Sequence, residues 1–198
     1  MISYVSGKLA FKDPTYVIID VGGLGYQVKI SLQTYSKIKD EEQVRLLTFL
    51  HIKEDAHTLY GFKEEDEKRL FLLLIGINGV GPNTGLMILS SLNTEEIEHA
   101  ILSGDVATIQ HVKGIGVKTA QRIILELKDK VGKSGSEASV SALGFLKSSN
   151  KVREEALQAL ITLGFQKTAA EKNIASVLKK TVGEISLEDL IKASLKTP

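Results

Sequence analysis

The feature that most constrains this chain is a pattern written twice: an apolar helical segment, a Gly-hydrophobic-Gly turn and a second apolar helical segment. The first copy is LIGINGVGPNTGLMIL at 74–89, and the second is IQHVKGIGVKTAQRII at 109–124. The second copy's glycines, Gly114 and Gly116, lie 35 positions after those of the first. A repeat this regular predicts two equivalent pairs of helices joined by equivalent turns.

Each turn has the chemistry of an anion site. Glycine permits a positive φ and leaves no side chain, so the backbone can approach another molecule closely. The hydrophobic residue between the glycines can anchor the turn in the core, while unpaired N–H groups at the start of the next helix point outward and suit a phosphate. The residues expected to bind phosphate are Gly79, Val80, Gly81, Asn83 and Thr84 in the first copy, and Lys113, Gly114, Ile115, Gly116, Lys118 and Thr119 in the second.

The two copies differ in charge. Lys113 and Lys118 flank the second turn, whereas Asn78 and Asn83 stand at the matching positions of the first. We therefore expect the second copy to supply more of the electrostatic affinity. A simpler interpretation of each turn is a tight connection that only packs the core, and for a single copy the two interpretations are equally good. The repetition at one offset favours binding.

Two other glycine-rich phosphate sites are excluded. The segment GINGVGPN has the span of a P-loop, but Pro82 and Asn83 stand where that loop needs Lys and Ser or Thr, and GIGVKT also lacks the full motif. A dinucleotide-binding fingerprint would need glycine at Thr84 or Thr119, and a strand upstream where both copies have helix. No nucleotide-hydrolysing loop is therefore expected.

Composition narrows the function classes further. The chain has no cysteine, and its four histidines lack metal-binding spacing, so we expect neither a metal nor a cofactor. The longest apolar runs, such as LFLLLIGI at 70–77, fall far short of the roughly 20 residues of a membrane span, which favours a cytoplasmic protein without membrane contact. Because the formal net charge is only +1, any DNA binding must use a local patch and backbone donors.

Periodicity divides the chain into segments and predicts a multidomain α+β fold. Residues 1–63 contain five short β-type runs with a brief helix at 32–38, which predicts an OB-type barrel, because an open sheet would expose its edges. Residues 64–132 have helical periodicity and hold both turns, which predicts an all-α DNA-binding domain. Residues 133–150 are rich in Ser and Gly and predict a flexible linker, and 151–198 predict a small C-terminal three-helix domain.

In combination, these segments resemble the RuvA family, the Holliday-junction-binding subunits of bacterial branch-migration complexes. The resemblance rests on DVGGLGYQV and KEDAHTLYGF in the barrel segment, on NGVGPNTG and KGIGVKTA as twin helix-hairpin-helix motifs, and on the helical tail. It implies a homotetramer, or an octamer of two tetramers, on four-way junction DNA in recombination and repair. It also implies a non-catalytic subunit that recruits a hexameric RuvB-type AAA+ ATPase, with a RuvC-type junction resolvase as a further partner.

The resemblance also assigns roles to residues outside the hairpins. The family's acidic pin maps onto Glu54 and Asp55, where it would separate strands; without the resemblance, two acids at a hairpin tip are an ordinary solvated turn. The contact with the ATPase maps onto Leu160, Leu163 and Phe165, which are otherwise most simply the core of a three-helix domain.

This sequence departs from the family pattern in the first hairpin. The family often has a basic residue where Asn83 stands and an alanine where Gly85 stands. A side-chain contact between the first hairpin and phosphate is therefore open.

Two other function classes stay open from the residues alone. A glycosylase or nuclease with such hairpins would need a catalytic Lys or Asp in a pocket or a carboxylate metal cluster, for which Glu54 and Asp55 are the candidates. A passive single-strand binder could use the barrel, but its strands show no basic groove with interleaved aromatic residues.

Overall fold

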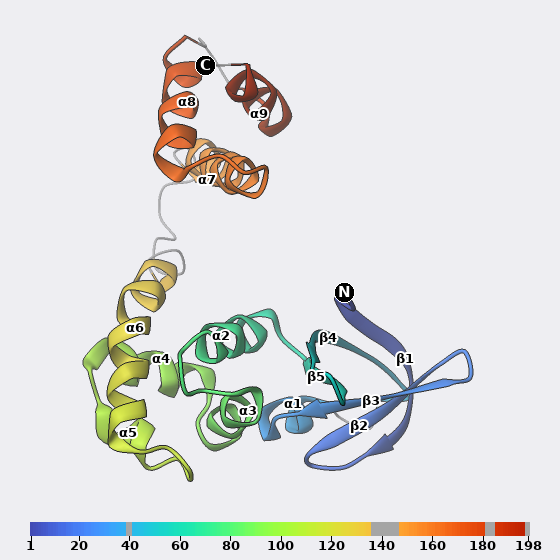
Figure 1. Cartoon of the computed structure of the whole chain (residues 1–198). Coiled ribbons are helices and arrows are strands. Elements are labelled where there is room, and N and C mark those ends of the chain that lie inside the picture. The colour runs from blue at the N-terminus through green and yellow to red at the C-terminus, as the bar shows by residue number, and fades with distance from the viewer. Residues whose placement is uncertain (39–40, 136–146, 181–184, 197–198) are drawn as a thin grey trace. The chain divides into compact units, whose positions relative to one another are not determined.

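The computed structural model describes residues 1–38, 41–135, 147–180 and 185–196 (Figure 1). The chain divides into two compact units, Met1–Ser136 and Glu137–Pro198. The first unit contains a closed β-barrel followed by helices, and the second contains three helices. Within the described residues, no helix combines the length and the hydropathy that crossing a membrane requires.

Five strands form the barrel: β1 (Tyr4–Lys12), β2 (Tyr16–Val21), β3 (Leu24–Ile30), β4 (Gln43–Ile52) and β5 (His57–Phe62). Around the barrel they follow the order β1-β2-β3-β5-β4, with β3 and β5 parallel and all other neighbours antiparallel. Alternate residues such as Val17, Val28 and Leu46 point inward and are fully buried. The expected five-stranded OB-type barrel is confirmed.

The helical part of the first unit contains α2 (Glu65–Ile75), α3 (Pro82–Ser91), α4 (Thr94–Ser103), α5 (Val106–Gln110) and α6 (Val117–Gly135). Asn93 and Glu96 form a reciprocal capping box at the start of α4, as their spacing predicts. The apolar faces of these helices meet in one core, in which Leu70, Ile88 and Ile123 are fully buried. The core also includes Tyr60 and Phe62 of β5, so barrel and helices are packed together.

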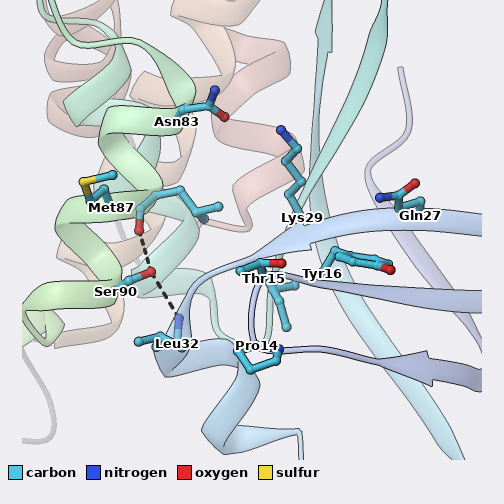
Figure 2. A pocket seen from close by; sticks show the side chains of 11 residues that line it. Pro14, Thr15, Tyr16, Gln27, Lys29, Leu32, Asn83, Met87 and Ser90 are labelled. Carbon is cyan, nitrogen blue, oxygen red and sulfur yellow. Dashed lines mark hydrogen bonds between the residues drawn. The ribbon is translucent and has the colours of Figure 1, made fainter.

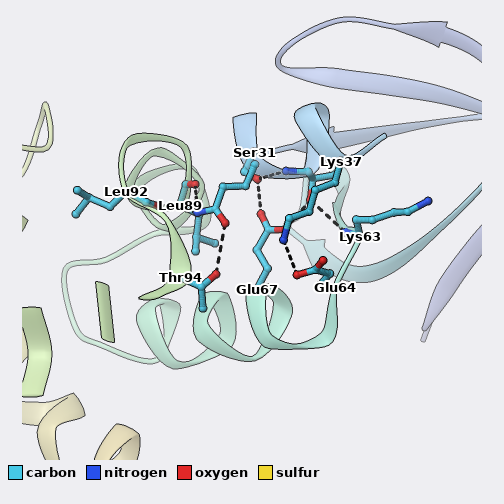
Figure 3. Close-up of polar contacts among 10 residues, drawn as sticks. Ser31, Lys37, Lys63, Glu64, Glu67, Leu89, Leu92 and Thr94 are labelled. Atoms are coloured by element: carbon cyan, nitrogen blue, oxygen red, sulfur yellow. Dashed lines mark hydrogen bonds and ion pairs between the residues drawn. The ribbon is translucent and has the colours of Figure 1, made fainter. Parts of the chain in front are cut away.

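A polar joint connects the barrel to the helices (Figure 3). Helix α1 (Leu32–Lys37) follows β3, and its cap Ser31 and its Thr34 both donate hydrogen bonds to the buried carboxylate of Glu67 in α2, the second at 2.7 Å. Burial raises the pKa of the Glu67 carboxyl, and the two hydroxyl donors act against that shift. Gln33 donates to the carbonyl of Leu89 at the end of α3 (2.9 Å). The bonds to Glu67 hold α2 against the barrel, and the Gln33 bond holds α3 and with it the first glycine turn.

The second unit contains α7 (Lys147–Thr162), α8 (Lys167–Lys180) and α9 (Leu187–Leu195), which confirms the three-helix domain. Helix α7 is followed by Gly164 with φ +98°, the left-handed residue typical of a helix end. The predicted linker, 133–150, is helical at both ends, where α6 continues to Gly135 and α7 begins at Lys147. Its remaining residues, 136–146, lie outside the described part of the chain.

Candidate nucleic-acid interface

The first glycine turn connects α2 to α3 through a tight set of backbone hydrogen bonds. The Val80 N–H donates to the Ile77 carbonyl at 3.0 Å, and the Gly85 N–H donates to the Gly81 carbonyl at 2.9 Å to begin the helical ladder. Gly79 has φ +94°, in the left-handed region that favours glycine. This turn is therefore fixed by its backbone.

The second turn, between α5 and α6, repeats the same bonds 35 positions later. Ile115 donates to the Val112 carbonyl at 3.1 Å, and Ala120 donates to the Gly116 carbonyl at 3.0 Å. Gly114 has φ +87°, close to the value at its counterpart in the first turn. The sequence repeat is thus a structural repeat, and the two helix-hairpin-helix motifs are confirmed.

The hydrophobic residue of each turn is an anchor in the core. Val80 is 4% exposed and Ile115 is 6% exposed, while the glycines on either side are exposed. The N–H groups of both anchors are occupied by bonds within their own turns. Both residues therefore hold their turns in place, and the expectation that they also contact phosphate stays a prediction.

The second glycine of each turn has no structural reason to be glycine. Among the described residues, a Cβ built on Gly81 or Gly116 would meet no atom within 4 Å beyond the immediate chain neighbours. Gly81 has φ −83° and ψ 169°, an extended conformation that any residue adopts. Because glycine has no side chain, an outside molecule can reach the backbone at these positions, as a close phosphate contact requires.

Free backbone donors lie beside these glycines. Gly81 is the N-cap of α3 and provides no side-chain cap, and Pro82 follows it at the first helical position. The N–H groups of Asn83 and Thr84 belong to the first turn of the helix, which has no intrahelical acceptors. Together with the positive end of the helix dipole they make a candidate anion site, and the equivalent donors of α6 make a second candidate site.

The side chains around the two sites differ as the sequence predicts. Lys113 and Lys118 are exposed and have no ion-pair partner among the described residues. In the first turn Asn78 and Asn83 are exposed and neutral, and the amide oxygen of Asn83 accepts a hydrogen bond from the Tyr60 hydroxyl at 3.0 Å. The loop of the first site therefore carries no cation of its own.

Arg122 connects the two hairpins. Its Nη1 donates to the backbone carbonyl of Asn78 at 3.0 Å, and its Nε lies 4.0 Å from the Glu126 carboxylate. The loop of the first hairpin is therefore held against the first turns of α6, which carry the second site. Sequence reasoning missed this bond, although Arg122 stands four residues after Lys118 and so shares its face of the helix.

A cavity of about 480 Å³ lies between the barrel and α3 (Figure 2). Gln27 and Lys29 of β3 line it from the barrel, and Asn83, Met87 and Ser90 line it from α3. It thus opens beside the N-terminal turn of α3, where the first anion site lies.

The acids predicted as a pin lie at the tip of the β4–β5 hairpin. The Lys53 N–H donates to the Ala56 carbonyl at 2.9 Å, which closes a turn with Glu54 and Asp55 at its centre, both exposed. Among the residues that the structure describes, no three His, Asp or Glu side chains gather as a metal site would need. Their expected role as a pin stays a prediction.

The three apolar residues of the second unit separate into different roles. Leu160 is 0% exposed and packs in the three-helix core, and its expected contact with a partner stays a prediction. Phe165 is half-buried against that core, and its N–H donates to the Leu160 carbonyl at 3.0 Å. Leu163 is 60% exposed and lines a shallow apolar groove with Ile191. Leu163 and Phe165 are the residues a partner could touch.

Comparison with known proteins covers nearly the whole chain. Residues 1–61 match the model of the RuvA N terminal domain, 71–129 match the SAM-like helix-hairpin-helix tandem, and 151–197 match the RuvA C-terminal domain. The chain is 57% identical to the Holliday junction branch migration complex subunit RuvA of Cytophaga hutchinsonii, with 99% of each chain covered. It is 49% identical to the protein of that name from Amoebophilus asiaticus, and 37% identical to that from Geotalea daltonii, over 99% of this chain in both cases and 100% and 98% of the relatives.

Proposed function

The chain belongs to the RuvA family, and on that premise we propose that it binds four-way (Holliday) DNA junctions and holds them open for branch migration by a partner ATPase in homologous recombination and repair. The observation that carries this proposal is the pair of hairpins with one backbone geometry and two exposed glycines that the fold itself does not require. Backbone donors bind phosphate and not bases, so recognition is independent of sequence. What is recognised is the spacing of phosphates on a branched DNA.

Assembly gives the sites their arrangement on the junction. A homotetramer, or an octamer of two tetramers, presents the paired hairpins to each of four duplex arms. The tips with Glu54 and Asp55 then gather near the centre, where their charge repels phosphates and keeps the strands apart. The bond between Arg122 and Asn78 supports the role of the paired hairpins, because it fixes the distance between the two phosphates that each subunit holds.

The chain itself catalyses no reaction. It is a non-catalytic subunit, and a hexameric RuvB-type AAA+ ATPase supplies the energy. The second unit recruits that ATPase through the surface around Leu163 and Phe165, and a RuvC-type resolvase acts on the junction held open. Since the bacterial chromosome is the substrate, the protein works in the cytoplasm.

A gel-shift comparison tests the proposal. The full chain is titrated against a four-way junction, a linear duplex and a single strand, each in two unrelated sequences. We expect the junction to bind at least about tenfold more tightly than the duplex, equivalent to about 1.4 kcal/mol, in both sequences. Equal affinity for junction and duplex, or a strong sequence preference, would contradict the proposed function.

The same assay tests the pin. The variant Glu54→Gln/Asp55→Asn removes the repulsion between the two carboxylates and the DNA phosphates. Duplex binding should therefore increase several-fold at low salt, because each exposed charge pair contributes on the order of 1 kcal/mol or less. Binding to the junction should gain less. Unchanged duplex affinity at low salt, where exposed charges act most strongly, would reduce the two acids to a solvated turn.

A further inference from the structure

The two anion sites are unequal in a way that the hairpins alone do not explain. Both have the same turn geometry and the same exposed donors, yet only the second carries lysines, at Lys113 and Lys118. The loop of the first site offers only the amides of Asn78 and Asn83. The Arg122 guanidinium, which donates to the Asn78 carbonyl, also lies 4.0 Å from the Glu126 carboxylate, so its charge is partly compensated. The question is whether another part of the first unit supplies the missing charge.

The barrel brings one lysine to that place. Lys29 lies on β3, and its ammonium nitrogen sits 5.9 Å from the centre of the Tyr60 ring. The hydroxyl of the same Tyr60 donates to the amide oxygen of Asn83, in the first turn of α3. Burial raises the pKa of Tyr60, so this hydroxyl stays a donor at neutral pH. Tyr60 thus connects Lys29 to the first anion site.

The surroundings of Lys29 leave its charge uncompensated. Lys29 and Asn83 line the same cavity, and Figure 2 shows the Lys29 side chain extending from the sheet on the side of Asn83. None of the other described residues that line the cavity is charged, and Lys29 has no ion-pair partner within the described ranges. It is half-buried, so its attraction for an anion is less screened than that of a lysine in open solvent.

We propose that Lys29 is the phosphate-binding cation of the first hairpin, serving from the barrel the role that Lys118 serves within the second. The ligand is a backbone phosphodiester of the junction, held by the N–H groups at the start of α3 and neutralised by the Lys29 ammonium. This inference rests on the proposed function. It makes the DNA-binding surface a joint product of the barrel and the helices.

The experiment measures junction affinity of the full chain over a range of salt concentrations. Lys29→Gln should weaken binding about tenfold near 0.1 M salt and flatten the dependence of log K on log salt by about 0.9 for each subunit that loses a phosphate. Lys29→Arg should bind like the wild type. Lys118→Gln is the positive control, and Lys172→Gln, the same charge change in the second unit, should leave affinity unchanged.

A compensating variant separates a phosphate contact from a structural role. Placing a lysine within the first hairpin, Asn83→Lys, should restore the affinity and salt slope lost in Lys29→Gln, because the first site then resembles the second. Two outcomes would contradict the proposed function. One is that Lys29→Gln and Lys118→Gln both leave junction affinity unchanged, and the other is that the wild type does not prefer the junction. If those controls hold and Lys29→Gln keeps wild-type affinity and slope, the role of Lys29 is refuted. It is equally refuted if Lys29→Gln lowers the melting temperature or disrupts assembly and Asn83→Lys does not restore binding.

Discussion

The two hairpins share one backbone conformation but are held in place by different contacts. The first is held from outside: Tyr60 of the barrel bonds to Asn83, and Arg122 of the other hairpin bonds to Asn78. The second has exposed lysines at both flanks of its turn and, within the described residues, no hydrogen bond to the barrel. The comparison teaches that the apolar anchor and the glycines determine the turn, while charge can come from different parts of the chain.

The difference in support extends to the barrel. Gln33 in α1 donates to the carbonyls of Leu89 and Leu92 (2.9 and 2.6 Å), at the far end of the helix that begins with the first hairpin. The first hairpin is therefore tied at both ends of α3 to the domain that carries Glu54 and Asp55. We infer that the first hairpin sets the distance between bound phosphate and pin, whereas the second contributes more of the electrostatic attraction.

The largest expected effect tests what the hairpins share. Gly81→Val and Gly116→Val each place a side chain where phosphate approaches, so each should weaken junction binding by about 100-fold, the loss of one or two charge-assisted hydrogen bonds. Stability should hardly change, because among the described residues a Cβ at either position meets no atom within 4 Å beyond the immediate chain neighbours. Gel shifts and thermal unfolding of the same samples measure both quantities.

Gly79→Val is the matched control for these variants. Gly79 has φ +94°, so a side chain there strains the backbone and should cost about 1–2 kcal/mol of unfolding free energy. Equal destabilisation of the Gly79 and Gly81 variants would show that both glycines serve the fold, and the argument for an open phosphate contact would be lost.

An intermediate effect tests what the hairpins do not share. Lys118→Gln should weaken binding about tenfold and reduce the salt slope by about 0.9 for each phosphate released. Asn83→Ala should leave the slope unchanged, since no charge is lost, but should cost about 1 kcal/mol of stability because the Tyr60 hydroxyl loses its acceptor. Equal slopes for the two variants would contradict the assignment of a phosphate contact to Lys118.

Structural features that depend on residues close together in the sequence were predicted well. The strands follow β-type runs, the two turns follow Gly-hydrophobic-Gly, and the anchors Val80 and Ile115 are buried as a residue between two turn glycines should be. Each of these depends on the identities of neighbours within a few positions. The capping box of Asn93 and Glu96 belongs to the same class.

Contacts between distant residues were missed, because nothing in the local pattern pairs them. Arg122 and Asn78 are 44 positions apart, and Tyr60 and Asn83 are 23 apart. In the sequence Glu67 is one of four consecutive acids at 64–67, a pattern typical of a helix N-terminus, but it is buried and accepts bonds from the hydroxyls of Ser31 and Thr34. Helical spacing offered a signal, since Glu67 stands three and four residues before the core residues Leu70 and Phe71.

The smallest expected effect concerns a buried position where the hairpins differ, Gly85 in the first and Ala120 in the second. Ala120 is fully buried, and Ala120→Gly should cost about 1 kcal/mol from helix propensity alone. The reverse change in the first hairpin, Gly85→Ala, is not expected to gain the same amount of stability. A Cβ at Gly85 would lie 3.2 Å from Ile75 and 3.3 Å from the Phe71 ring, and that ring is held by Phe62 with a centroid distance of 4.8 Å.

Because the Phe71 ring has little room to move, the crowding should cancel the gain in helix propensity. Gly85→Ala is thus expected to leave the unfolding free energy within about 0.5 kcal/mol of the wild type, against a propensity gain of about 1 kcal/mol without crowding. Denaturant unfolding of the two single variants measures the asymmetry, and junction binding should not change in either. A full gain of about 1 kcal/mol in Gly85→Ala would mean that the first hairpin is as loosely packed against Phe71 as an exposed helix, and the view that the barrel braces it would have to be given up.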